Sequence, residues 1–162
     1  MFIIKRFILM LLISILCNGS GAAKDNNKKN PVFEAKAIGK TETNEIKDKK
    51  KKAKKTALKW IKLLDSGKIF TSWEKAGELF RESISLKDWN SQLEKIRKSY
   101  GKVIKRELLT VKYYNNLPDV PEGEYVILQF KTCFKNREDV IENIIPQKEN
   151  QKKWRVAGYS MR

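Results

Sequence analysis

The chain has no histidine and only two cysteines, Cys17 and Cys133, among its 162 residues. Histidine is the commonest general base and the commonest metal ligand, so its absence excludes Ser-His-Asp and Cys-His catalytic arrangements and histidine-based metal sites. Two thiols cannot build a four-cysteine zinc site. The eight glycines are scattered and form no phosphate-binding loop. We therefore expect no metal, no cofactor and no catalytic residue of these kinds.

The first 22 residues have the pattern of a signal peptide. Lys5 and Arg6 precede an apolar run over residues 7–16, which is too short to span a bilayer as a helix but has the length of a signal-peptide core. Ser20 and Ala22 supply the small side chains that a signal peptidase accepts, so cleavage is expected after Ala22 or one residue later. This pattern predicts an exported protein, either periplasmic or secreted.

Cys17 offers an alternative, because a cysteine at the end of the apolar run could carry a lipid anchor. Lipoprotein processing generally requires a small residue before the cysteine, and here that residue is Leu16. We therefore favour ordinary cleavage over anchoring at Cys17. Cleavage leaves Cys133 as the sole thiol, so no intramolecular disulfide can form and the fold must depend on its apolar core.

Residues 23–52 differ in composition from the rest of the chain. Asn, Lys, Thr and Glu dominate, Pro31 and Gly39 interrupt, and apolar residues are isolated. Such a segment buries too little apolar surface to offset the entropy lost on ordering. We predict a disordered, lysine-rich tether.

The end of this segment carries a dense run of lysines. Six of the seven residues from 49 to 55 are lysines. The candidate binding residues are Lys49, Lys50, Lys51, Lys52, Lys54 and Lys55. The run either docks on an anionic partner or forms the solvated first turns of a helix, as charge runs commonly do.

Residues 53–64 show helical periodicity. Apolar residues recur at three- and four-residue steps, and lysines occupy the opposite side. The apolar positions are Ala53, Ala57, Trp60, Ile61 and Leu64. Gly67 follows where a left-handed helix C-cap is expected. The pattern predicts a first helix with one buried face.

Two further helices are predicted before Gly101. In the first, Thr71 and Glu74 have the spacing of a capping box. Its expected buried residues are Phe70, Trp73, Ala76 and Phe80. The second opens with Ser85 as N-cap and Asp88 three residues further on. Its expected buried residues are Leu86, Trp89, Leu93, Ile96 and Tyr100.

Trp60 and Trp73 lie on the inward stripes of adjacent predicted helices. An aromatic residue on such a stripe is usually part of the core, so we interpret both as braces of the fold. They would line a pocket only if the sheet curled away from the helices.

After Gly101 the apolar period changes to two. Strands are predicted over residues 103–114, 123–134, 139–145 and 153–161. Pro146 is expected to end the third strand. In the second strand Val126 and Leu128 share one face and Gln129 lies on the other. Helices followed by consecutive strands predict an α+β domain over residues 53–162, with three helices on one face of a curved four-stranded antiparallel sheet.

Several ordered blocks carry a family resemblance. They are ALKWIKLLDSGKIFTSWEKAGELF at 57–80, GKVIKREL at 101–108, GEYVILQFKTCF at 123–134 and KWRVAGY at 153–159. Together they resemble the bacterial family known as domain of unknown function 4019, over roughly residues 53–162. By analogy this family is similar to cystatin-like and nuclear-transport-factor-2-like folds, which implies a strongly bent sheet with a conical cavity. The resemblance implies no activity, because fold alone does not fix function.

Three carboxylates and one thiol are the remaining candidates for chemistry. Glu107, Glu124 and Glu142 lie on or beside predicted strands, and one buried in a cavity would have a raised pKa. Glutamates on a half-exposed sheet are usually solvated, however. Cys133 is either a redox thiol activated by a neighbouring lysine or a small buried hydrophobe, and it lacks a resolving cysteine. We predict that the protein is not an enzyme.

Charge leaves two classes of function. The net charge is +16, or +14 after Lys5 and Arg6 leave with the signal peptide. The first class is a non-catalytic module of the cell envelope that binds a small apolar ligand or a protein partner. The second is an electrostatic binder of anionic lipid or another envelope polyanion through the basic tether. Nucleic acid matches the charge but not the export signal, and no basic motif interleaved with aromatics is present.

Overall fold

The computed structural model describes residues 42–150 and 153–162. The predicted signal peptide, Cys17 and the first part of the predicted tether lie outside these residues. The helices are α2 (Asn44–Asp65), α3 (Ile69–Lys75), α4 (Glu78–Ser83) and α5 (Leu86–Tyr100). The strands are β1 (Val103–Tyr114), β2 (Tyr125–Phe134), β3 (Arg137–Lys148) and β4 (Trp154–Met161). The predicted α+β class is confirmed.

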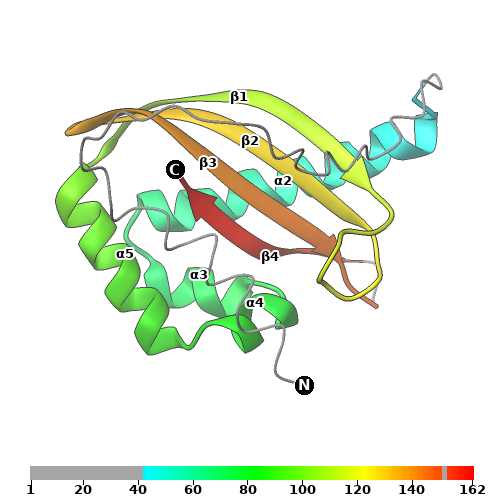
Figure 1. The fold of residues 1–162 in the computed structure, drawn as a ribbon, viewed down its shortest axis with the longest axis horizontal. Helices are drawn as coiled ribbons and strands as arrows, with labels where there is room; N and C mark the ends of the chain where they lie inside the picture. The colour runs from blue at the N-terminus through cyan, green and yellow to red at the C-terminus, as the bar shows by residue number, and fades with distance from the viewer. Residues whose placement is uncertain (1–41, 151–152) are drawn as a thin grey trace, which may run out of the picture.

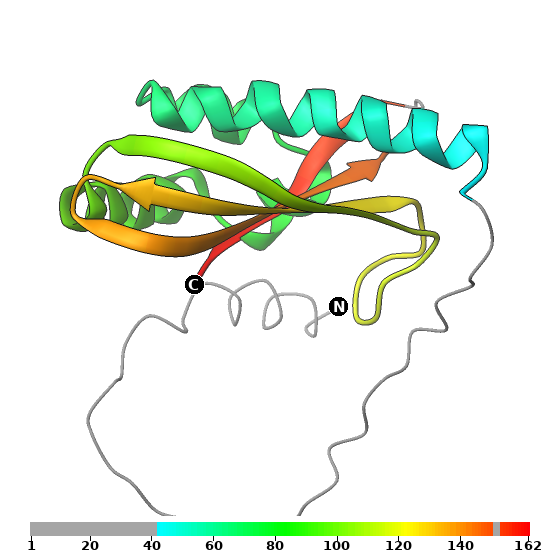
Figure 2. The ribbon, with the colours of Figure 1, turned by 90° about the horizontal axis from the view of Figure 1, so that it is seen from above.

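The four strands form one open antiparallel sheet in the order β1-β2-β3-β4. The sheet is strongly twisted, and α2 lies along one of its faces (Figures 1 and 2). α2 contacts all four strands, whereas α3, α4 and α5 gather on the side of β4, away from β1. The long helix therefore spans the sheet, and the three shorter helices complete the core beside it.

The predicted tether ends too late, because α2 begins at Asn44 and residues 44–52 are helical. The side chain of Thr43 caps this helix by accepting a hydrogen bond from the backbone N–H of Ile46, at 3.3 Å. Further along, Lys49 contacts residues on the sheet that are distant in sequence. This contact stabilises a segment whose local composition indicates disorder. All five apolar positions predicted for this helix are buried.

The first of the two helices predicted between Gly67 and Gly101 is in fact two short helices, α3 and α4, which are separated at Gly77. The backbone N–H of Gly77 donates a hydrogen bond of 2.7 Å to the carbonyl of Val156 on β4. A Cβ at this position would lie 3.0 Å from Oε1 of Glu149, so the close approach favours glycine. The break therefore fixes both helices against the start of β4.

Two details predicted for this region are wrong. Phe70 was expected in the core, but it is 60% exposed. Thr71 and Glu74 form no capping box, because α3 begins at Ile69 and Thr71 already lies inside its first turn. The periodicity was correct for Ala76 and Phe80, which are buried.

The predicted limits of α5 are confirmed. The hydroxyl of Ser85 accepts a hydrogen bond of 3.1 Å from the backbone N–H of Asp88. Gly101 ends the helix with φ +77°, a left-handed conformation that favours glycine. Trp89 and Leu93 are buried.

The strands follow the predicted pattern except at Pro146. Val126 and Leu128 are fully buried, and Gln129 on the other face is partly exposed. β3 continues past Pro146 to Lys148, with a register irregularity between Ile145 and Pro146. Such irregularities accommodate a proline, which cannot donate a ladder hydrogen bond. The prediction that Pro146 ends the strand is therefore wrong.

An aromatic cluster fills the space between α2, α4, α5 and the sheet. Its rings are Trp60, Phe80, Trp89 and Tyr159, with centroids 5.0 Å apart for Phe80 and Trp89 and 5.5 Å apart for Trp60 and Tyr159. Both indole N–H groups donate to Ser72, at 2.8 Å from Trp60 and 3.0 Å from Trp89. Trp60 is thus a brace of the fold, as predicted.

Candidate functional site

The exposed side of α2 is occupied almost entirely by lysine. Buried residues such as Ala57 and Trp60 define one side of the helix, and at about 100° per residue the exposed lysines fall around the opposite side. The exposed lysines are Lys47, Lys51, Lys52, Lys54, Lys55, Lys59 and Lys62. Within residues 47–62 the single acid is Asp48. This lysine face is about 24 Å long at 1.5 Å per residue, and it is held on a rigid element.

Lys49, one of the six predicted binding residues, faces the sheet. Its Nζ lies 2.7 Å from Oε1 of Glu45 and 3.0 Å from Oε2 of Glu124. It also donates a hydrogen bond of 3.4 Å to the hydroxyl of Tyr113. Hydrogen bonds to Glu45 and Glu124 raise the pKa of Lys49 above its ordinary value. Lys49 therefore attaches α2 to the sheet.

The other five predicted lysines lie outside that contact. Lys50 pairs with Glu42 at 2.9 Å, and Lys52 pairs with Asp48 at 2.7 Å. Both acids are close in sequence to their partners. Among the described residues, Lys51, Lys54 and Lys55 have no acidic partner. These three lysines are also exposed, so they are accessible to a partner.

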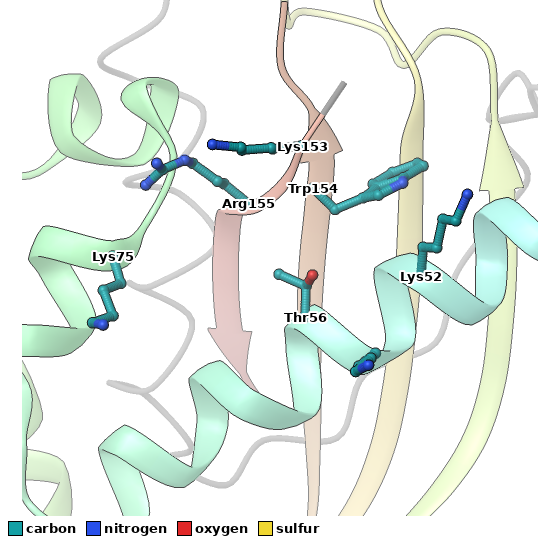
Figure 3. A pocket seen from close by; sticks show the side chains of 7 residues that line it. Lys52, Thr56, Lys75, Lys153, Trp154 and Arg155 are labelled. Atoms are coloured by element: carbon teal, nitrogen blue, oxygen red, sulfur yellow. The ribbon is translucent and has the colours of Figure 1, made fainter. Parts of the chain in front are cut away.

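A depression of about 540 Å³ lies beside the lysine face, between α2, the end of α3 and the start of β4 (Figure 3). We call it the basic groove. It is lined by Lys52, Lys55, Thr56, Lys75, Lys153, Trp154 and Arg155. Lys153 and Arg155 extend to one side of the chain and Trp154 to the other, as expected for alternating strand positions. Burial of Trp154 therefore directs both neighbouring cations into the groove.

Two of the five cations in the basic groove have acidic partners. Lys52 pairs with Asp48, and Nε of Arg155 lies 3.0 Å from Oε2 of Glu149. Lys55, Lys75 and Lys153 pair with no acid in the part of the chain that the structure describes. Three elements therefore bring unpaired positive charge to one depression, where an anion would reduce the repulsion.

A second depression of about 530 Å³ shares Arg155 with the basic groove. We call it the acidic depression. It is lined by Trp73, Glu74, Glu78, Arg81, Glu149, Asn150 and Arg155. Oε1 of Glu149 accepts a hydrogen bond of 2.9 Å from the backbone N–H of Glu78. Its three glutamates outnumber Arg81 and Arg155 by one, so the lining changes from positive in the basic groove to slightly negative here.

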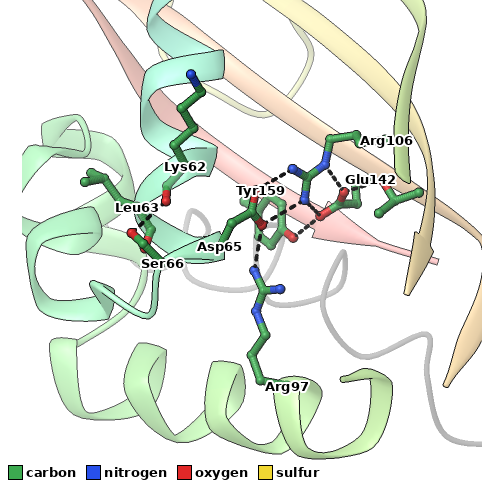
Figure 4. Close-up of polar contacts among 9 residues, drawn as sticks. Lys62, Leu63, Asp65, Ser66, Arg97, Arg106, Glu142 and Tyr159 are labelled. Carbon is green, nitrogen blue, oxygen red and sulfur yellow. Dashed lines mark hydrogen bonds and ion pairs between the residues drawn. The ribbon is translucent and has the colours of Figure 1, made fainter. Parts of the chain in front are cut away.

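A buried ion cluster occupies the other end of α2 (Figure 4). The Glu142 side chain is fully buried, and its carboxylate accepts hydrogen bonds from Arg106 Nε at 2.6 Å and Tyr159 at 2.5 Å. Thr132 donates to the same carboxylate. Arg106 also contacts Asp65 at 2.6 Å, and thereby connects the sheet to the end of α2.

The cluster is closed by Arg97 of α5, which lies 3.2 Å from Asp65. Burial disfavours the charged form of Arg106, but its hydrogen bonds to Asp65 and the charge of Glu142 outweigh burial and raise the pKa of Arg106. Burial and the charge of Glu142 raise the pKa of Tyr159 well above its ordinary value. The arginine therefore stays charged and the phenol stays neutral, an arrangement suited to structural support.

The three candidate carboxylates have different environments. Glu107 is exposed on β1. Glu124 binds Lys49 and Lys148; burial alone would raise its pKa, but these hydrogen bonds lower it. Glu142 is buried and bonded on both oxygens. The structure thus brings none of the three together.

The partners of Glu142 were not predicted from the sequence, although its position on β3 carries one signal. Glu142 lies on β3 between the buried residues Val140 and Ile144, so it occupies an inward position. A charged residue at such a position requires a buried partner. Cys133, the other candidate, is half-buried, and its Sγ lies 3.7 Å from the carbonyl of Phe134.

These features define a small α+β domain with a lysine face on its longest helix and a basic groove beside it. The chain belongs to the family described as protein of unknown function, DUF4019, whose model matches residues 56–159. No curated protein and no solved structure matches the chain. The analogy to cystatin-like folds therefore stays a prediction.

No group of three or more cysteine, aspartate or glutamate side chains in residues 42–150 and 153–162 is arranged to hold a metal ion. None of the helices described above has the length and apolar character needed to cross a membrane.

Proposed function

We propose that this chain is a non-catalytic, exported module that docks on an anionic surface of the cell envelope through the lysine face of α2. The observation that carries the proposal is the set of seven exposed lysines on one side of one helix. Because α2 packs across all four strands, these charges approach a surface together. In this proposal the docking element is the rigid helix α2 and not a flexible tether.

The expected strength of such docking is considerable. A basic residue near an anionic membrane contributes about 1 kcal/mol, and the contributions of several residues combine. Salt weakens them, because the Debye length falls from roughly 10 Å at 0.1 M to about 3 Å at 1 M. Docking of this kind needs no shaped pocket, so it selects for charge density and little else.

Three further observations support a non-catalytic, exported protein. The chain lacks histidine, and the carboxylate of Glu142 is fully occupied by hydrogen bonds within the fold. The first 22 residues carry the signal-peptide pattern described above. A lysine face on an exported protein would meet the anionic lipids and polymers of the envelope.

The test is co-sedimentation of the purified chain with liposomes of anionic or neutral phospholipid across a salt series. The variant carries four substitutions on the lysine face outside the basic groove: Lys51→Gln, Lys54→Gln, Lys59→Gln and Lys62→Gln. We expect salt-sensitive binding to anionic liposomes by the wild-type chain and a loss of at least about tenfold in the variant, since each lysine contributes about 1 kcal/mol.

A matched control removes four exposed lysines from elsewhere in the domain. The control substitutions are Lys87→Gln, Lys95→Gln, Lys98→Gln and Lys135→Gln. This variant has the same net charge as the lysine-face variant, so it should keep most of the binding. Equal losses in the two variants would mean that net charge alone attracts the chain. Binding that ignores salt would also overturn the proposal.

A further inference from the structure

The basic groove has a more specific character than the lysine face beside it. Its cations come from three elements, α2, α3 and β4, and they converge on one concave depression. Lys75 and Lys153 belong to the groove alone, whereas Lys52 and Lys55 are shared with the lysine face. Thr56 adds a hydroxyl to the lining. Ammonium, guanidinium and hydroxyl donors around a hollow are the groups that bind phosphate and similar oxyanions.

The fold holds these donors in place. Trp154 is buried in the core, and this fixes the directions of Lys153 and Arg155 on either side of it. Glu149 binds Arg155 at 3.0 Å and also accepts from the start of α4, so the guanidinium is held at the boundary of the groove. Donors that are fixed before binding lose less freedom when a ligand arrives.

The acidic depression limits what the ligand can be. It begins at Arg155, where the basic groove ends, and its three carboxylates, Glu74, Glu78 and Glu149, outnumber Arg155 and the one further cation of the lining, Arg81. Glu74 and Glu78 have no basic partner among the described residues. A long polyanion that continued past Arg155 would meet these carboxylates and be repelled. A compact anion would end before reaching them.

The neighbouring surface also favours a positive group. Trp73 lines the acidic depression together with the carboxylates. Carboxylates beside an aromatic ring are favourable to an ammonium group, through ion pairing and the cation–π interaction. A molecule with a phosphate at one end and an ammonium at the other would therefore match the reversal of charge across Arg155.

We infer that the basic groove binds one compact phosphate group of a molecule whose adjoining part is neutral or positively charged, as in a phosphoethanolamine. The inference rests on the proposed function only in assigning an anion-binding role to this side of the domain. The basic groove differs from the lysine face in the residues that bind the ligand and in the ligands that it should prefer. The lysine face should prefer the partner with the most charge, whereas the groove should discriminate against extended polyanions.

The test is isothermal titration with three probes: inorganic phosphate, O-phosphoethanolamine and tripolyphosphate. The titrated chain carries the four substitutions of the lysine-face variant, which keep every residue of the basic groove, so the lysine face does not add its own preference for charge. Simple electrostatic attraction ranks tripolyphosphate first, because it carries the most negative charge. We expect O-phosphoethanolamine to bind more tightly than both other probes. The Lys75→Gln and Lys153→Gln double variant should weaken its binding by at least about tenfold, the usual effect of losing a charge-assisted hydrogen bond.

A second variant tests the selectivity. Glu74→Gln with Glu78→Gln removes the negative charge beyond Arg155, so it should improve the binding of tripolyphosphate relative to O-phosphoethanolamine. The matched control is Lys87→Gln with Lys95→Gln, two exposed lysines of α5 whose loss should leave all three affinities unchanged. Thermal unfolding of each variant verifies that the exposed substitutions leave the fold intact.

Three results would overturn the inference. One is tighter binding of tripolyphosphate than of O-phosphoethanolamine by the chain that lacks the four lysines of the lysine face. Another is an equal effect of the groove variant and the control. The third is no binding of any probe at millimolar concentration. None of these results bears on liposome docking, and the lysine-face variant keeps Lys75 and Lys153, so the two proposals fail separately.

Discussion

The buried ion cluster at the end of α2 and the lysine face along the same helix are built in opposite ways. At the end of α2, Asp65 meets Arg97 and Arg106, and Arg106 meets Glu142. Each of these charges has an opposite partner. The lysine face has seven exposed lysines, and the same stretch of helix contains one acid, Asp48.

This difference separates two uses of charge. A charge inside a fold must be paired and hydrogen-bonded, because an unpaired buried charge is strongly destabilising. A charge on the surface is solvated and needs no partner for folding, so a large unpaired excess of one sign is available for binding. The buried cluster can therefore be tested by its effect on stability, and the lysine face by its effect on association.

The largest expected effect comes from breaking the buried cluster. Arg106→Met removes the partner of Glu142 and leaves a carboxylate in a fully buried position. Removing one partner of a buried pair typically costs about 3–5 kcal/mol. We expect a loss of this size in the free energy of unfolding, measured by urea denaturation at neutral pH.

The controls distinguish pairing from packing. Lys105→Met makes the same type of change at the neighbouring exposed position and should be close to neutral. The double variant Arg106→Met with Glu142→Leu removes both charges, and replacing a buried pair by apolar residues is often neutral. The double variant should therefore be more stable than Arg106→Met alone. If both are equally unstable, the cluster acts through packing and not through charge pairing.

The local elements of this fold could be predicted from sequence because each depends on neighbouring residues. The apolar stripe from Ala53 to Leu64 and the cap at Ser85 are local patterns, and both were found. The start of α2 depends on Lys49 reaching Glu124, and the break at Gly77 depends on Val156. Such contacts join residues that are far apart in sequence, so composition alone gave the wrong result.

The candidate sites also divide into features that are visible in the local sequence and features that depend on contacts between distant residues. The lysine run is visible in the sequence, and of its two interpretations the structure bears out the one that places it in the first turns of a helix. The basic groove was missed because Lys75 and Lys153 are brought to α2 only by the packing of α3 and β4. Glu142 was identified as a carboxylate of interest, but its pairing with Arg106 joins two strands separated by β2.

An intermediate effect is expected from the contact that attaches the first turns of α2 to the sheet. Glu124 has a lowered pKa in the folded chain because of its hydrogen bonds from Lys148 and Lys49, which outweigh burial. Its stabilising contribution is therefore fully present above its ordinary unfolded pKa of about 4.3 and is lost as the pH falls through the lower folded value.

Glu124→Gln tests this dependence on pH. We expect the variant to be less stable than the wild-type chain by about 1 kcal/mol at pH 7, since the pairs are only partly buried. The difference should begin to shrink in urea melts as the pH falls below about 4.3, where the carboxylate of the unfolded chain is protonated, and should be lost once the pH has passed the lower folded pKa. Glu107→Gln, on an exposed residue of β1, is the matched control and should show neither effect. A difference that persisted at low pH would assign the effect to packing.

The smallest expected effect, and the one whose sign is most informative, is that of the lysine face on stability. Lys51 lies four residues before Lys55, and Lys55 four before Lys59, a spacing at which like charges on a helix repel. Each such pair destabilises a helix by about 0.2–0.5 kcal/mol, and salt screens the repulsion. The four-lysine variant described above should therefore be as stable as the wild-type chain, or slightly more stable, in thermal melts at low salt, and the gain should vanish at high salt. A lower melting temperature would mean that these lysines support the fold as Lys49 does. A face that is unfavourable for folding and favourable for docking is what the proposed function requires.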